Sequence, residues 1–296
     1  MTASLPSLQR DFSRAIQHKL RDLERATGIT ILYACEAGSR AWGFASRDSD
    51  YDIRFIYKRP AASYLTLHRK ANYEPIGGTE DILQTLDTVE SKVIYRSYIS
   101  GHEDLELDMA GWDVDKALKL TLKANASVYE WLNASTVYLS QTAFVDALQD
   151  EAISCFVSKA AAYHYYGLAQ RHAQEYLFKG QETVPLKKYL YILRCLLAVD
   201  YICYHKTIPP LSIDDLVLKS NWSGEDRYKL KQLLDFKSLG VESMHLANDK
   251  EYVLTGMQQR LEAAKRSVEA DTSRKRDSEY DPERLNTLFR ETILSY

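Results

Sequence analysis

The sequence predicts an α+β protein in which a small mixed β-sheet is followed by a helical bundle. Between residues 30 and 110, short runs alternate apolar and polar residues with a period of two, as strands do. From Asp113 onward, apolar residues instead recur at helical spacing. No internal repeat or low-complexity tract interrupts either part. We therefore expect an α/β domain over residues 1–112 and a helical domain over 113–296.

The first part opens with an amphipathic helix from Leu8 to Ala26. A β-prone run from Thr30 to Ala34 leads to Gly38-Ser39, and Arg40 to Phe44 is long enough for one helical turn. Tyr51 to Tyr57 then alternates as a strand does. Because successive side chains of a strand point to opposite faces, one face would carry Ile53, Phe55 and Tyr57 and the other Asp50, Asp52 and Arg54.

The next stretch, Lys58 to Asp104, has a weaker pattern, although Thr85 to Ile99 is long enough for one or two strands. Asp104 to Ala110 is a clearer strand, with Leu105, Leu107 and Met109 alternating against Glu106 and Asp108.

The second part reads as a series of helices. Asp113 is a suitable N-cap for the first, and Asp281-Pro282 is a suitable start for the last. The predicted helices are Val114 to Lys123, a helical stretch over Thr142 to Phe178, Leu186 to His205, Asp226 to Lys237, Glu251 to Val268 and the final one after Pro282.

Composition narrows the class of protein. Thirty-eight basic residues against 41 acidic ones leave a net charge of −3, which argues against tight non-specific binding to nucleic acid. The four cysteines lack zinc-site spacing and lie among apolar residues, as reduced thiols do. The first residues have no signal-peptide h-region, and apolar runs such as Leu196 to Val199 are too short to cross a bilayer. We expect a cytoplasmic protein without a membrane partner.

The residues that indicate chemistry lie between Gly38 and Asp52. A Gly-Ser pair follows the first strand, and Asp50 and Asp52 open the next one. Carboxylates at i and i+2 share a face of a strand, and Mg²⁺ prefers one or two carboxylates together with water and substrate phosphates. Glycine allows close backbone approach to a phosphate, and the Ser39 hydroxyl adds a donor. This order of features predicts a site for metal-dependent phosphoryl-group chemistry.

The run GSRAWGFASRDSDYDIRFIY resembles the signature of the DNA polymerase β-like nucleotidyltransferase superfamily. The later runs ELDMAGWDVDKAL (residues 106–118), Glu130-Trp131-Leu132 and KKYLYILRCL (residues 187–196) resemble, more narrowly, the predicted nucleotidyltransferases associated with RNA ligases. The similarity covers most of residues 30–205 and leaves the last 90 or so without an interpretation.

The resemblance implies a Mg²⁺- or Mn²⁺-dependent nucleotidyltransferase that transfers an NMP from an NTP by a two-metal mechanism. It implies Asp108 as a third carboxylate beside Asp50 and Asp52, with Glu106 as the alternative. Gly38, Ser39 and Arg40 of the motif would bind the nucleotide. The acceptor is a hydroxyl or phosphate of unknown identity, and the name of the family suggests RNA.

The helix from Leu186 to His205 offers further candidates. Lys187, Tyr191 and Arg194 recur at helical spacing beside an apolar stripe, so two cations and an aromatic ring share one face. They would contact phosphates and a base, unless the face is merely solvated. Lys123, at the end of the helix after the third carboxylate, is another phosphate-contact candidate. The histidines His102, His164 and His172 lack ligand spacing and are interpreted as structural.

Three other functions share some of these features. A haloacid-dehalogenase-type phosphohydrolase also uses an Asp-x-Asp pair, but its pair follows a strand, whereas Asp50 and Asp52 open one. A catalytically idle nucleotide-binding module would have no need of three carboxylates. An antitoxin-like transferase that modifies a partner protein or RNA shares the chemistry, and the sequence leaves it open. The oligomeric state and the NTP are equally open.

Overall fold

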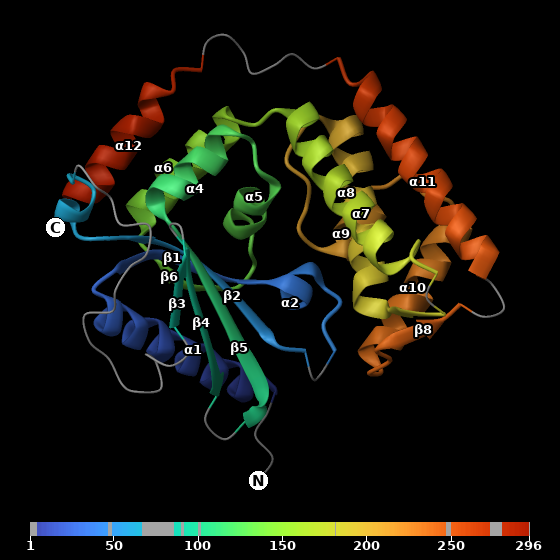
Figure 1. Ribbon diagram of the computed structural model, residues 1–296, viewed down its shortest axis with the longest axis horizontal. Helices are drawn as coiled ribbons and strands as arrows, with labels where there is room; N and C mark the ends of the chain where they lie inside the picture. The colour runs from blue at the N-terminus through green and yellow to red at the C-terminus, as the bar shows by residue number, and fades with distance from the viewer. Residues whose placement is uncertain are drawn as a thin grey trace.

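A computed structural model describes residues 5–46, 49–66, 86–89, 92–99, 102–180, 182–246, 250–272 and 280–295. For residues 5–10, 86–89, 92–99 and 102–106 the description is of the backbone alone. The fold is α+β, with a mixed sheet at one end and a helical bundle at the other (Figure 1). The predicted fold class is confirmed. Within the described ranges, no helix has the length and apolar content needed to span a bilayer.

The main sheet contains, among the described residues, six strands in the order β3-β4-β5-β2-β1-β6. Only β2 and β5 are parallel, and this pair lies at the centre of the sheet. The strands are β1 (Thr30–Ala37), β2 (Tyr51–Lys58), β3 (Leu86–Val89), β4 (Lys92–Ile99), β5 (His102–Asp113) and β6 (Val137–Ser140), while β7 (Thr183–Pro185) and β8 (Ser243–His245) form a separate ribbon.

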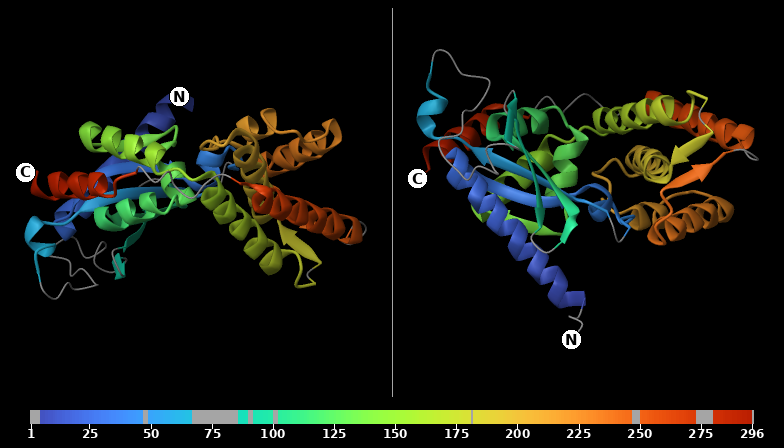
Figure 2. Two further views of the ribbon diagram at one scale, coloured as in Figure 1. Left: turned by 90° about the horizontal axis from the view of Figure 1, so that it is seen from above. Right: turned by 60° about the horizontal axis from the view of Figure 1, so that its bottom comes forward.

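Helix α1 (Leu5–Thr27) covers one face of this sheet (Figure 2). Its fully buried Ile16, Leu20 and Leu23 pack on Ile53, Phe55 and Tyr57 of β2, which are fully buried or nearly so. The predicted face of β2 is therefore confirmed, because these three alternate residues form the core side and leave Asp52 and Arg54 on the other. Leu107 and Met109 of β5 join the same cluster, as the predicted alternation of that strand requires.

The opposite side of the sheet is covered at one end by α4 (Val114–Leu122), α5 (Ala126–Leu132), α6 (Thr142–Ser154) and the C-terminal α12 (Glu283–Leu294). Asp113 caps α4 by accepting from the Asp115 N–H, as predicted. Helix α12 lies far from α11 and close to α6 (Figure 1), and Lys58 of β2 donates to the carbonyls of Thr292 and Ser295 at its end. The last residues of the chain therefore stabilise the sheet end of the molecule.

The second hydrophobic cluster belongs to the bundle, which the fully buried middle of α8 crosses. The bundle consists of α7 (Ser158–Tyr176), α8 (Leu186–His205), α9 (Ile213–Leu218), α10 (Gly224–Ser238) and α11 (Lys250–Ala270). The predicted stripe of leucines at 186, 190, 193 and 197 is buried. Phe44, which follows the short helix α2 (Gly38–Trp42), is inserted into this cluster and so ties the sheet to the bundle.

The structure contains elements that the sequence analysis did not predict, among them α5, α9 and β6, and it divides one predicted helix. The helical pattern over Thr142 to Phe178 is broken at Cys155 to Val157, and Val157 adopts an extended backbone. The break separates α6, which packs with the sheet, from α7, which packs in the bundle. No glycine or proline marks it, so tertiary packing decides where the helix ends. The division at residue 112 remains a prediction, and helices after it pack in both clusters.

Candidate active site

The turn after β1 places Gly38 against Asp52. Gly38 has φ +62°, in the left-handed region that glycine tolerates. A Cβ on Gly38 would lie 1.9 Å from Asp52 Oδ2. Glycine is therefore required for two reasons, the backbone angle and the closeness of the carboxylate. The next residue, Ser39, is buried, and its Oγ has no hydrogen-bond partner among the described residues.

Asp52 and Asp108 lie directly opposite each other on the parallel strands β2 and β5. Arg54, two residues along β2, bridges them: its Nη2 is 3.0 Å from Asp52 Oδ1 and 3.1 Å from Asp108 Oδ2. Both carboxylates remain partly exposed, at 19% and 32% of their side chains. Two of the three predicted carboxylates thus share one small site, and Arg54 belongs to it as well.

Asp50 does not join this pair. It is exposed, lies before β2 begins, and does not line the cavity described below. Searched over the described residues, the structure holds no cluster of three or more His, Cys, Asp or Glu side chains arranged for a metal ion. Arg40 also lies outside the cavity: it donates to the Ser49 carbonyl and lies 3.9 Å from the centre of the Tyr51 ring. Its role here is to hold the segment before Asp50.

Beneath Asp52 lies a buried carboxylate that the sequence did not single out. Glu36 on β1 accepts from the Asp52 N–H at 3.1 Å and from the Tyr138 hydroxyl at 2.5 Å. Burial raises the pKa of Glu36 to about 7, against the opposing effects of the Tyr138 hydrogen bond and the Arg40 charge. Glu36 therefore supports the backbone of Asp52 without reaching the cavity.

A cavity of about 510 Å³ opens above the carboxylate pair. The sheet contributes Asp52, Arg54 and Asp108, the turn contributes Gly38, and α8 contributes Lys187, Lys188 and Tyr191. The carboxylates of the sheet and the cations of the bundle therefore line the same cavity. Of the predicted nucleotide contacts, Gly38, Lys187 and Tyr191 line it. Ser39, Arg40, Lys123 and Arg194 do not, and Lys123 is exposed at the end of α4.

Arg194 lies inside the protein instead of on a solvated face. It is fully buried, its Nη1 is 2.8 Å from Glu130 Oε1, and its Nε donates to the Leu211 carbonyl. Glu130 of α5 also accepts from the Trp42 indole at 3.2 Å and from the Tyr165 hydroxyl at 3.0 Å. The ion pair joins α5 to α8, and the Tyr165 hydrogen bond adds α7. Because Glu130 lines the cavity and Arg194 lies behind it, Arg194 supports the cavity wall in this structure.

Aromatic rings form the remaining walls. Trp112 and Trp131 are stacked with centroids 3.8 Å apart, and both line the cavity. On the bundle side, Tyr191 packs against Trp42 and His172, at 4.9 and 4.8 Å between centroids. Of these rings, the sequence analysis gave a binding role to Tyr191 alone. Trp112 could have been found as well, because it lies four residues after Asp108 on one strand and therefore shares its face.

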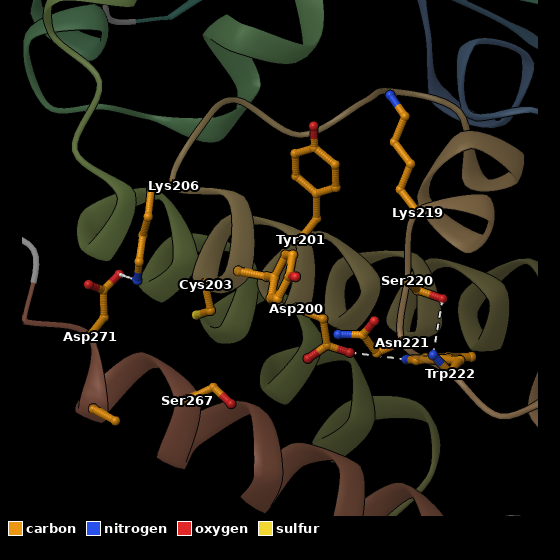
Figure 3. Close-up of a pocket in the computed structure, with 12 residues that line it drawn as sticks. Asp200, Tyr201, Cys203, Lys206, Lys219, Ser220, Asn221, Trp222, Ser267 and Asp271 are labelled. Carbon is orange, nitrogen blue, oxygen red and sulfur yellow. Dashed lines mark hydrogen bonds and ion pairs between the residues drawn. The ribbon is translucent and has the colours of Figure 1, made fainter.

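A second cavity, also about 510 Å³, lies between α8, the segment that joins α9 to α10, and the end of α11 (Figure 3). Its two carboxylates already have partners: Lys206 contacts the buried Asp271 at 2.8 Å, and the Trp222 indole N–H donates to Asp200 at 3.0 Å (Figure 3). Burial also raises the pKa of Asp200. None of the predicted site residues lines it, so the candidate site is the cavity above Asp52 and Asp108.

One comparison with known protein families agrees with the resemblance seen in the sequence. The model of the RNA repair pathway DNA polymerase beta family, RlaP, matches residues 12–291. The uncharacterized protein YcgL of Bacillus subtilis is 34% identical over 250 residues, which are 83% of this chain and 86% of YcgL. A crystal structure of a nucleotidyltransferase-like protein from Exiguobacterium sibiricum aligns with 96% of this chain and 88% of its own, at 10% identity and a TM-score of 0.29.

Proposed function

Because the chain belongs to the RNA repair pathway DNA polymerase beta family, we propose that it transfers a nucleoside monophosphate from an NTP to an acceptor. The observation that carries this proposal is the Asp52–Asp108 pair, in register beside the Gly38 turn and facing the lysines of α8 across one cavity. Carboxylates on one side and cations on the other suit a metal–triphosphate ligand.

The residues present fit a divalent cation. Asp52 and Asp108 offer two carboxylates from neighbouring strands. Mg²⁺ commonly takes one or two carboxylates from a protein. The neighbouring Ser39 Oγ is buried and lacks a partner among the described residues, but Ser39 does not line the cavity, so we do not count it as a ligand. Bound Mg²⁺ or Mn²⁺ would neutralise the charge that develops on the transferred phosphate. The two-metal form of this chemistry also requires Asp50 to join the pair.

In the proposed reaction, the acceptor oxygen attacks the α-phosphorus, the bond to the pyrophosphate oxygen breaks, and pyrophosphate leaves. Asp108, on the acceptor side, takes the proton of the acceptor hydroxyl. Lys187 and Lys188 balance the charge of the triphosphate, and the stacked Trp112 offers its ring to a base. RNA as the acceptor and a cytoplasmic location remain proposals drawn from the family and the composition.

The test uses the full chain with each α-labelled NTP, Mg²⁺ or Mn²⁺, and candidate acceptors: RNA ends, proteins and small hydroxyl compounds. Asp52→Asn keeps the shape of the side chain and removes its charge, so transfer should be lost while the fold is retained. Asp108→Asn should stop transfer and spare much of the NTP binding measured by calorimetry. Full activity of Asp52→Asn would refute the proposed metal site, whatever the acceptor proves to be.

A further inference from the structure

Arg54 occupies the centre of the carboxylate pair and is held there by the backbone. Its Nη2 contacts Asp52 Oδ1 and Asp108 Oδ2, as described above. Its Nη1 donates to the Asp108 carbonyl at 2.9 Å and to the Ile53 carbonyl at 3.0 Å. Two backbone acceptors on adjacent strands therefore fix the guanidinium independently of the carboxylates. Arg54 is therefore fixed in the site by hydrogen bonds to the backbone, unlike a surface side chain that contacts the carboxylates only in one of many conformations.

This position limits what a free cation gains from the site. An arginine keeps its proton in proteins, so the charge of Asp52, Asp108 and Arg54 together is −1 instead of −2. One oxygen of each carboxylate is also engaged, because Asp52 Oδ1 and Asp108 Oδ2 accept from Arg54. Asp52 Oδ2 lies against the Gly38 turn, which limits access to it. A divalent cation that enters alone therefore meets a net charge of −1 instead of −2.

We propose that Arg54 makes cation binding at Asp52 and Asp108 dependent on a triphosphate. A free divalent cation binds weakly, because the guanidinium already balances part of the carboxylate charge. Triphosphate oxygens offset the positive charge of Arg54 and supply the remaining ligands that Mg²⁺ takes from phosphates. The inference rests on the proposed function and adds an order of binding to it, in which the cation and the nucleotide enter the site together. Arg54 acts as a positioning residue, since it acts through the carboxylates and not on the reacting atoms.

Two other roles for Arg54 give different results. If it only joined β2 to β5, its removal would lower stability and leave cation affinity unchanged or reduced. If it were mainly a phosphate ligand, its removal would weaken binding of triphosphate in the absence of metal. The proposal instead requires that a neutral residue at position 54 raise the affinity for a cation alone.

The experiment measures Mn²⁺ binding to the full chain by electron paramagnetic resonance, with and without inorganic tripolyphosphate, which carries the phosphates but no base. In the unchanged protein, Mn²⁺ should bind weakly alone and much more tightly with tripolyphosphate. Arg54→Met and Arg54→Gln should raise the affinity for Mn²⁺ alone by about tenfold or more, because a cation a few ångströms away is removed. Arg54→Lys keeps the charge and should behave as the unchanged protein does.

Thermal unfolding identifies which neutral variant folds, and Arg54→Gln retains a hydrogen-bond donor in case Arg54→Met does not. A folded neutral variant that binds Mn²⁺ no more tightly than the unchanged protein overturns the role of Arg54. Tight Mn²⁺ binding without phosphate, lost in Asp52→Asn, also overturns it but leaves the metal site intact. Absence of Mn²⁺ binding in every variant and condition would instead contradict the proposed function itself.

Discussion

Replacing Gly38 by alanine tests the site at its closest contact. The new Cβ would lie 1.9 Å from Asp52 Oδ2 and 2.6 Å from its Cγ. Real Cβ atoms essentially never come within 3.0 Å of another heavy atom, so the carboxylate must retreat by about 1.1 Å. Its other oxygen is held by Arg54, and the retreat therefore disturbs the whole pair. A displacement of about 1 Å at a reacting centre lowers a rate by about 100-fold.

The same substitution also strains the backbone, because alanine at φ +62° adds roughly 1–2 kcal/mol to the folded state. Gly180→Ala separates the two effects: Gly180 has φ +83°, and its Cβ would meet nothing within 4 Å. Both variants should lose similar stability in urea unfolding, and only Gly38→Ala should lose labelled-NMP transfer and Mn²⁺–tripolyphosphate binding. If Gly38→Ala retained the activity of Gly180→Ala, the close contact between Gly38 and Asp52 would have no functional importance.

Three further predictions concern two residues that line the cavity and one that supports it from below. Glu130→Gln leaves the fully buried Arg194 without its carboxylate, so it should lower the free energy of unfolding, measured by urea titration, by about 3 kcal/mol. The control is Glu225→Gln, in an exposed pair with Lys229, which should change that free energy little. Trp112→Ala should weaken NTP binding by about 5- to 100-fold, the range for loss of one stacked base, and leave tripolyphosphate binding unchanged, both measured by calorimetry. Tyr204→Ala, in the second cavity, is the control. Equal losses of affinity for NTP and for tripolyphosphate in Trp112→Ala would exclude base stacking. The raised pKa of Glu36, about 7, means that the folded state favours the protonated acid. This residue's contribution to stability is therefore present below its ordinary pKa near 4.5 and is lost as the pH rises to about 7. In metal-free protein, Glu36→Gln should remove that part of the decline in stability between pH 4.5 and 7, and an unaltered pH dependence of stability would contradict the shift.

The sequence alone predicted much of the sheet end of the molecule, because local periodicity determines which face of an element is buried. Alternation along Tyr51 to Tyr57 placed Ile53, Phe55 and Tyr57 in the core, and the structure confirms it. The same alternation put Asp52 and Arg54 on one face. The family signature added Asp108, which lies opposite Asp52 in the sheet. The helix bounds at Leu186 and His205 were also predicted, since an apolar stripe and its flanking polar residues specify a helix locally.

Only the tertiary structure decided what those faces meet. Helical spacing grouped Lys187, Tyr191 and Arg194, but Glu130 of another helix draws Arg194 into the interior and leaves the other two at the cavity. The stack of Trp112 on Trp131 joins a strand to a helix, and no periodicity within either segment encodes it. Asp50 lies two residues before Asp52, the spacing that puts side chains on one face of a strand. It lies before the strand starts, however, where this alternation no longer applies. A pattern along the chain fixes the direction of a side chain relative to its own element. The partner that side chain meets depends on how separate elements pack, and here that packing forms the cavity between the sheet and the bundle.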